Sequence, residues 1–135
     1  MLLERSAGAE GTGPYRVLVA DDEPTILRLT EFVLSRAGYA VRTVINGDEA
    51  LEMIAEWKPD ILVLDVMMPR RDGFAVAEAV RADPEIAHTP IIMLTARAQD
   101  SDIERGTLAG ADTYLTKPFE PDLLVETVGG YLRRG

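Results

Sequence analysis

Apolar residues along this chain gather in two alternating kinds of segment. Short runs of four or five mostly apolar residues are followed by longer segments in which apolar residues recur every three or four positions. The first pattern predicts buried β-strands and the second predicts amphipathic α-helices. The predicted strands are Arg16–Ala20, Tyr39–Thr43, Ile61–Leu64, Ile91–Leu94 and Asp112–Thr116. The predicted helices are Pro24–Ala37, Asp48–Trp57, Phe74–Ala82, Ser101–Ala109 and Pro121–Leu132.

Regular alternation of strands and helices predicts right-handed crossover connections and a parallel sheet with helices on both faces. Ile61–Leu64 and Ile91–Leu94 are apolar throughout, as expected of central strands covered on both sides. Tyr39–Thr43 is more polar and is expected to be more exposed. A chain of 135 residues suits one domain of this kind. The predicted fold class is α/β, with a doubly wound parallel sheet.

The first predicted helix has one expected buried stripe, and Gly38 is expected to end the helix as a left-handed cap residue. We expect the aromatic side chains of Phe32 and Trp57 to be packing residues and not binding platforms. The residues of the expected stripe are Ile26, Leu29, Thr30, Val33 and Ala37.

Charged and hydroxyl residues stand at four of the predicted strand ends. Asp21 and Asp22 follow the first strand, Asp65 the third, Thr95 the fourth and Lys117 the fifth. The carboxyl ends of parallel strands lie at one edge of a sheet, which is where ligands bind in open α/β folds. We therefore expect three carboxylates, a hydroxyl and an ammonium group to meet in one cleft.

Three neighbouring carboxylates repel one another, so their pKa values rise unless positive charge offsets the repulsion. Mg²⁺ is the natural candidate, because it prefers oxygen ligands and often binds one or two carboxylates together with a phosphate. Lys117 would supply a second positive charge. One carboxylate would be left as the nucleophile of an acyl phosphate. The position of Asp65 on a central strand favours it for that role.

Each of these residues also has an ordinary structural explanation. An aspartate after a strand is commonly a turn residue, and Asp21 or Asp22 could cap the following helix. Thr95 could be a simple strand-end residue, and Lys117 could be solvated. The functional interpretation rests on all four strand ends together, in this order along the chain.

Composition and charge exclude or disfavour several classes of function. The net charge of −9 disfavours direct binding of nucleic acid or of anionic membrane surfaces. No apolar run approaches the roughly 20 residues of a membrane span. The chain has no cysteine, which excludes thiol catalysis and is compatible with a reducing, cytoplasmic compartment. Residues 1–14 have no signal-peptide pattern and are interpreted as a flexible leader to a domain over residues 15–135.

Five segments of the chain resemble the receiver domains of bacterial two-component response regulators. They are VLVADDEP, ILVLDVMMPRRDGF, PIIMLTARA, GADTYLTKPF and the closing helix. The resemblance extends from about Tyr15 to Arg134. It implies a flavodoxin-like sheet with the strand order 2-1-3-4-5, flanked by five helices.

The resemblance also implies a role for each residue of the acidic group. Asp65 would accept a phosphoryl group from a sensor histidine kinase or a phosphotransfer protein. Asp22 and Asp65 would bind Mg²⁺ directly, and Asp21 would act mainly through water. The backbone carbonyl of Met67 would complete the protein ligands. Beyond catalysing its own phosphorylation and dephosphorylation, such a domain is not an enzyme.

Further implied roles concern the response to phosphorylation. Lys117 would pair with the phosphoryl group, and Thr95 would move towards it while Tyr114 turns inward. This change would alter the face made by the fourth helix, fifth strand and fifth helix, which partners would read. Met67 and Arg97 would tune the lifetime of the phosphoryl group, although Arg97 could also be merely solvated. The bond between Lys117 and Pro118 is usually cis in this family.

Other interpretations stay open at this point. A Mg²⁺-dependent aspartyl-phosphate phosphatase would share the nucleophile, but it typically has a second acid where this chain has Met67, which cannot transfer protons. An unphosphorylated pseudo-receiver and a flavodoxin-like cofactor binder are further alternatives. The chain could be a monomer or a phosphorylation-dependent homodimer, and Thr113 stands where a second Asp of the charged dimer surface is common. An output domain or output protein is an expected downstream partner.

Overall fold

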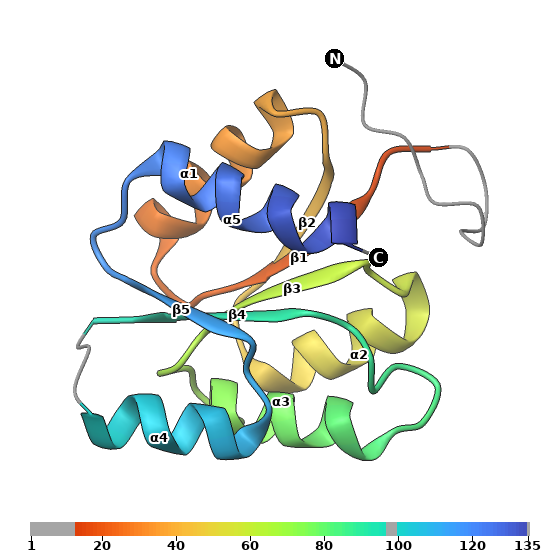
Figure 1. Ribbon diagram of the computed structural model, residues 1–135, viewed down its shortest axis with the longest axis vertical. Coiled ribbons are helices and arrows are strands. Elements are labelled where there is room, and N and C mark those ends of the chain that lie inside the picture. The colour runs from red at the N-terminus through yellow and green to blue at the C-terminus, as the bar shows by residue number, and fades with distance from the viewer. Residues whose placement is uncertain (1–12, 97–99, 135) are drawn as a thin grey trace.

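The computed structural model describes residues 13–96 and 100–134, in which strands and helices alternate as expected (Figure 1). The strands are β1 (Arg16–Ala20), β2 (Ala40–Val44), β3 (Ile61–Asp65), β4 (Ile91–Thr95) and β5 (Thr113–Thr116). The helices are α1 (Pro24–Arg36), α2 (Gly47–Trp57), α3 (Gly73–Ala82), α4 (Asp100–Ala109) and α5 (Pro121–Arg134). The strand order is β2-β1-β3-β4-β5 and all pairs are parallel, which confirms the predicted fold class and order.

The sheet separates two apolar cores because successive strand residues point to opposite faces. Figure 1 shows α1 and α5 on one face and α2, α3 and α4 on the other. Alternate residues such as Leu62 and Leu64 pack towards α2 and α3, while Ile61 and Val63 pack towards α1 and α5. All four are completely buried. This double cover explains why the central strands are apolar throughout, and it holds their carboxyl ends in fixed positions.

The bounds of the elements agree with the predicted ones to within two residues. Two of the differences matter for function, because Asp65 and Thr95 are the last residues of β3 and β4, not residues that follow the strands. Their backbones are therefore paired within the sheet, opposite Leu94 and Thr116 respectively. The structure consequently restrains both side chains more tightly than a loop would.

The predicted buried stripe of α1 is confirmed at Thr30 and Ala37, but it is wrong at Leu29 and omits Leu34. Thr30 and Leu34 are the buried residues of α1, whereas Leu29 is 39% exposed and Phe32 is 59% exposed. The Thr30 hydroxyl donates a hydrogen bond to the Ile26 carbonyl at 2.7 Å, so its burial leaves no polar group unpaired. The helix has apolar residues on most of its circumference, and only packing on the sheet selects one stripe.

The prediction for Trp57 as a packing residue is confirmed, whereas that for Phe32 is wrong. Trp57 is partly buried against the core of the α2 face, and the guanidinium of Arg42 lies 4.7 Å from its ring centroid. Phe32 projects from α1, where its one described ring contact is with Arg36, 5.6 Å from the centroid. An aromatic residue inside an amphipathic helix is therefore not a sufficient sign of burial.

Arg81 at the end of α3 joins several segments near the amino ends of β4 and β5. Its guanidinium donates hydrogen bonds to the carbonyls of Ala87, Thr89 and Gly110 over 2.6–3.0 Å. It also pairs with the Asp112 carboxylate at 2.9 Å, and that carboxylate accepts a further hydrogen bond from the backbone of β4. Arg81 thus connects α3 to the turn before β4 and to the α4–β5 loop.

Some of the sequence-based predictions fall outside the described residues. Arg97 lies in one gap, and most of the proposed leader lies in residues 1–12. Within the described part of the chain, every helix is too short or too polar to span a bilayer.

Candidate functional site

The parallel sheet brings the predicted site residues to one edge. β1 ends at Ala20, next to Leu64 of β3, so Asp21 and Asp22 emerge beside Asp65. On the other side of β3, β4 and β5 run in register until Thr95 and Thr116, and Lys117 follows directly. The predicted convergence of these residues is therefore confirmed by the strand order and register.

Lys117 is the charged centre of this edge. Its Nζ lies 2.9 Å from Asp21 Oδ2, 3.0 Å from Glu23 Oε1 and 3.3 Å from Asp65 Oδ1. The Lys117 side chain is only 8% exposed, so the possibility that it is merely solvated is wrong. A buried ammonium group is stable only when counter-charges surround it, and the carboxylates supply them.

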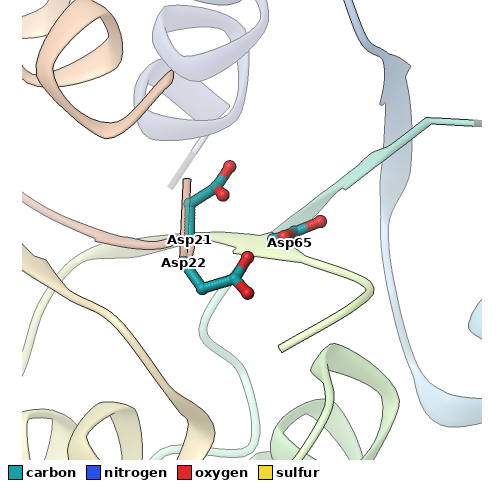
Figure 2. A group of neighbouring side chains, drawn as sticks. All are labelled: Asp21, Asp22 and Asp65. Atoms are coloured by element: carbon teal, nitrogen blue, oxygen red, sulfur yellow. The ribbon is translucent and has the colours of Figure 1, made fainter. Parts of the chain in front are cut away.

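The three aspartates form a compact acidic group. Figure 2 shows Asp21, Asp22 and Asp65 around a common space, and each offers one carboxylate oxygen within 4.8 Å of the others. Asp21 is completely buried and Asp65 nearly so, whereas Asp22 is exposed. The group is thus open to solvent on the side of Asp22.

Burial and repulsion disfavour the charged form of Asp65. Burial, followed by the neighbouring Asp21 carboxylate, raises the pKa of Asp65 from 3.8 to about 7. Lys117 and the Met67 backbone N–H, which donates to Asp65 Oδ1 over 3.3 Å, act in the opposite direction. Burial alone would lower the pKa of Lys117, but the carboxylates of Asp21, Glu23 and Asp65 around its ammonium raise it to about 12. The site therefore has an excess of negative charge.

The donor set fits a divalent cation. Among the described residues, Asp21 Oδ2 is the buried side-chain oxygen without a hydrogen-bond partner, because its contact with Lys117 lacks hydrogen-bond geometry. Lys117 offsets part of its charge, but one ammonium group does not offset three neighbouring carboxylates, so the group still favours a further cation. Three carboxylates with mutually close oxygens are the ligands that Mg²⁺ prefers.

The helix-capping explanation for the acidic pair does not hold. The N-cap of α1 is Glu23, and no side chain caps the helix there. Asp21 Oδ1 does accept a hydrogen bond from the backbone N–H of Glu23 at 2.9 Å, which orders the turn after β1. Asp21 therefore has one oxygen in the turn and the other directed at Lys117.

The remaining predicted residues lie around the same edge. Thr95 is buried at the end of β4, next to β3, which carries Asp65. The Thr95 carbonyl accepts a hydrogen bond from the Lys117 backbone N–H at 2.7 Å. Tyr114 of β5 is partly buried against the core that α4 helps to cover. Met67 is 73% exposed beside the acidic group. The bond between Lys117 and Pro118 is cis, as predicted.

Sequence reasoning missed one contributor to the site, Glu23. Glu23 was not among the predicted site residues, although it closes the acidic run and pairs with Lys117. Gly73, which belongs to the segment that resembles receiver domains, packs directly behind Asp65, and an added Cβ would stand 2.5 Å from the Asp65 carbonyl oxygen. The position of Glu23 in the run gave a signal, but a contact across 94 residues could not be read from local patterns.

Comparison with known proteins identifies the family. The model of the response regulator receiver domain matches residues 17–129. The PhoP regulator of alkaline phosphatase synthesis from Bacillus subtilis is 43% identical over 119 residues, which are 88% of this chain and 49% of PhoP. The transcriptional regulator RpaA of Synechocystis is 40% identical over 119 residues, with the same 88% and 49% covered. This chain spans about half the length of these curated relatives.

Comparison of the fold with solved structures supports the same family. The crystal structure of a putative response regulator from Chloroflexus aurantiacus superimposes with a TM-score of 0.85 and 42% identity, covering 89% of this chain and 98% of the other. The family model's match over residues 17–129 includes the strand ends that carry the acidic group and Lys117. The chain therefore belongs to the response regulator receiver domains of two-component signal transduction.

Proposed function

We propose that Asp65 accepts a phosphoryl group and that this modification switches the domain between two conformations. One observation carries the proposal: the buried ammonium of Lys117 contacts both Asp65 and Asp21, while Asp22 holds a third carboxylate at the open side of the same group. Such a site binds and stabilises a dianionic group on Asp65. A purely structural ion pair would have no need of the two additional carboxylates.

The reaction is transfer from a phosphohistidine. A carboxylate oxygen of Asp65 attacks phosphorus, the phosphorus–nitrogen bond breaks, and the imidazole leaves with the bonding electron pair and is then protonated. The product is an acyl phosphate on Asp65. Lys117 pairs with the incoming oxygens, and the hydroxyl of Thr95 donates to one of them.

The acidic group would hold the Mg²⁺ that this transfer requires. Asp22 and Asp65 would be direct ligands, Asp21 would act through water, and the Met67 carbonyl would be the remaining protein ligand. When bound, the metal supplies positive charge against the phosphoryl oxygens. The raised pKa of Asp65 supports this assignment, because a neighbouring cation would restore the ionised nucleophile at neutral pH.

The switch is a shift between two populations. The phosphoryl group adds about −1.5 to −2 charges, and Thr95 and Lys117 satisfy its oxygens only in one arrangement of their loops. Tyr114 packs beneath this region and would move further into the core as Thr95 shifts. Met67 and Arg97 would influence the lifetime of the adduct. Partners would read the result on the face formed by α4, β5 and α5.

The wider context is proposed from the same reasoning. A sensor histidine kinase or phosphotransfer protein would donate the phosphoryl group in the cytoplasm. Residues 15–135 would form the receiver domain and residues 1–14 a leader. An output domain or protein would respond, since the relatives named above are transcriptional regulators. This domain itself would not bind nucleic acid or membranes, and it would be a monomer or a phosphorylation-dependent homodimer.

The test is intact-mass analysis after incubation with a small phosphodonor such as acetyl phosphate. We expect one added phosphoryl group that requires Mg²⁺ and is absent from Asp65→Asn. Asp60→Asn is the matched control, because it removes a carboxylate at the opposite end of β3. Undiminished labelling of Asp65→Asn would refute the assignment of the nucleophile. Continuous turnover of the phosphodonor without accumulation of the adduct would favour the phosphatase alternative.

A further inference from the structure

Glu23 directs its side chain away from the helix that it precedes. It is the N-cap of α1 and has an extended backbone, but its side chain makes no hydrogen bond to the first turn. Glutamate is also a poor choice for that position compared with Ser, Thr, Asp or Asn. Its carboxylate instead accepts a hydrogen bond from Lys117 Nζ at 3.0 Å. The side chain of Glu23 thus contributes to the acidic site and not to the helix end.

The three carboxylates around Lys117 differ in exposure. The Asp21 side chain is 0% exposed and that of Asp65 is 7% exposed, whereas that of Glu23 is 60% exposed. The distance from Nζ to Asp65 is the longest of the three, at 3.3 Å. An ammonium group has three donors, and three carboxylate oxygens lie within 3.3 Å of this one. A new acceptor on Asp65 would therefore compete with these carboxylates for the ammonium.

Glu23 is the partner that is easiest to displace. Water solvates an exposed carboxylate well, so an ion pair with an exposed carboxylate contributes little to stability. Withdrawal of a buried carboxylate from its cation costs several times more, because no water replaces the lost charge. A phosphoryl group with about −1.5 to −2 charges would therefore compete with Glu23 before it competes with Asp21.

We propose that Glu23 is a positioning residue that holds the Lys117 ammonium in the unphosphorylated protein and releases it when Asp65 is phosphorylated. The proposal rests on the proposed function of Asp65. Because Glu23 must be released, it opposes the phosphorylated form. Removal of its carboxylate should raise the equilibrium constant for the phosphorylated form by about two- to fivefold. This factor corresponds to the free energy of one weak ion pair.

The test uses beryllofluoride, which binds reversibly to a carboxylate and mimics a phosphoryl group, in saturating Mg²⁺. Calorimetric titration should show that Glu23→Gln binds beryllofluoride about two- to fivefold more tightly than wild type, for the reason above. Glu23→Asp keeps the charge but shortens the side chain by one methylene, so it should resemble Glu23→Gln. Glu120→Gln, which removes an exposed carboxylate three residues after Lys117, should resemble wild type.

A separate titration with Mg²⁺ alone tests whether Glu23 acts through Lys117. We expect the Mg²⁺ affinity of Glu23→Gln to equal that of wild type, and a change parallel to that for beryllofluoride would overturn the proposal. Unchanged beryllofluoride affinity in Glu23→Gln, or wild-type behaviour of Glu23→Asp, would overturn it as well. Failure of wild type to bind beryllofluoride would instead refute the proposed function. Urea unfolding establishes that each variant is folded.

Discussion

The raised pKa of Asp65 predicts that its charge destabilises the metal-free domain, and Asp65→Asn tests this directly. The pKa rises from 3.8 to about 7, because the carboxylate is buried beside Asp21. The folded state therefore binds more protons than the unfolded state between these two values. The contribution of Asp65 to stability is therefore largest below about pH 4, falls as the pH rises towards 7, and levels off above it.

The size of the effect follows from the shift. A difference of about three pKa units corresponds to roughly 4 kcal/mol, at about 1.4 kcal/mol per unit. The Asp65 side chain is only 7% exposed, so solvent screens little of this energy. Coupling to Asp21 and local relaxation reduce it, so we expect about 2–4 kcal/mol at pH 8. Asparagine has nearly the same shape and no charge, and it should recover most of this stability.

The assay is urea unfolding in EDTA between pH 5 and pH 8.5. The unfolding free energy of wild type should fall across this range, whereas that of Asp65→Asn should vary much less. The contribution of Lys117 is constant here, since its raised pKa means that its stabilisation is lost only above about pH 10.5. Asp122→Asn, at an exposed position in α5, should give a curve parallel to that of wild type.

Two results would refute this reasoning. One is a wild-type unfolding free energy that does not change between pH 5 and pH 8.5, and the other is an Asp65→Asn variant no more stable than wild type at pH 8. Either would mean that burial and repulsion at Asp65 are already compensated within the protein.

Addition of Mg²⁺ at pH 8 should stabilise wild type more than Asp65→Asn, because a ligand stabilises the state that binds it.

Three further substitutions test the site and its support. Lys117→Met should lower metal-free stability by about 3–5 kcal/mol at pH 8, because it leaves Asp21 and Asp65 without their cation; a loss below 1 kcal/mol in urea unfolding would contradict the ion-pair geometry. Gly73→Ala should slow phosphorylation of Asp65 in the mass assay, since the added Cβ would meet the Asp65 carbonyl at 2.5 Å; wild-type rates would show that the loop yields freely. Arg81→Met removes four hydrogen bonds and should cost about 2–4 kcal/mol, and Arg81→Lys should restore little of it, as a single ammonium cannot reach all four acceptors.

Much of the candidate site could be predicted because it depends on chain topology. Alternating strands and helices specify a parallel sheet, and a parallel sheet places the ends of its strands at one edge. The convergence of Asp21, Asp65, Thr95 and Lys117 follows from that rule alone. It needs no knowledge of side-chain conformation, so local sequence patterns were sufficient.

The tertiary structure decided what depends on distance and dielectric environment. No local pattern states that Glu23 reaches Lys117, that Leu34 and not Leu29 is buried in α1, or that Arg81 joins three segments. The raised pKa of Asp65 likewise requires burial and a neighbouring charge that are separate in sequence. Hydrophobic periodicity is a property of consecutive residues and determines the elements, whereas electrostatic energies depend on positions in space and exist only after the elements have packed.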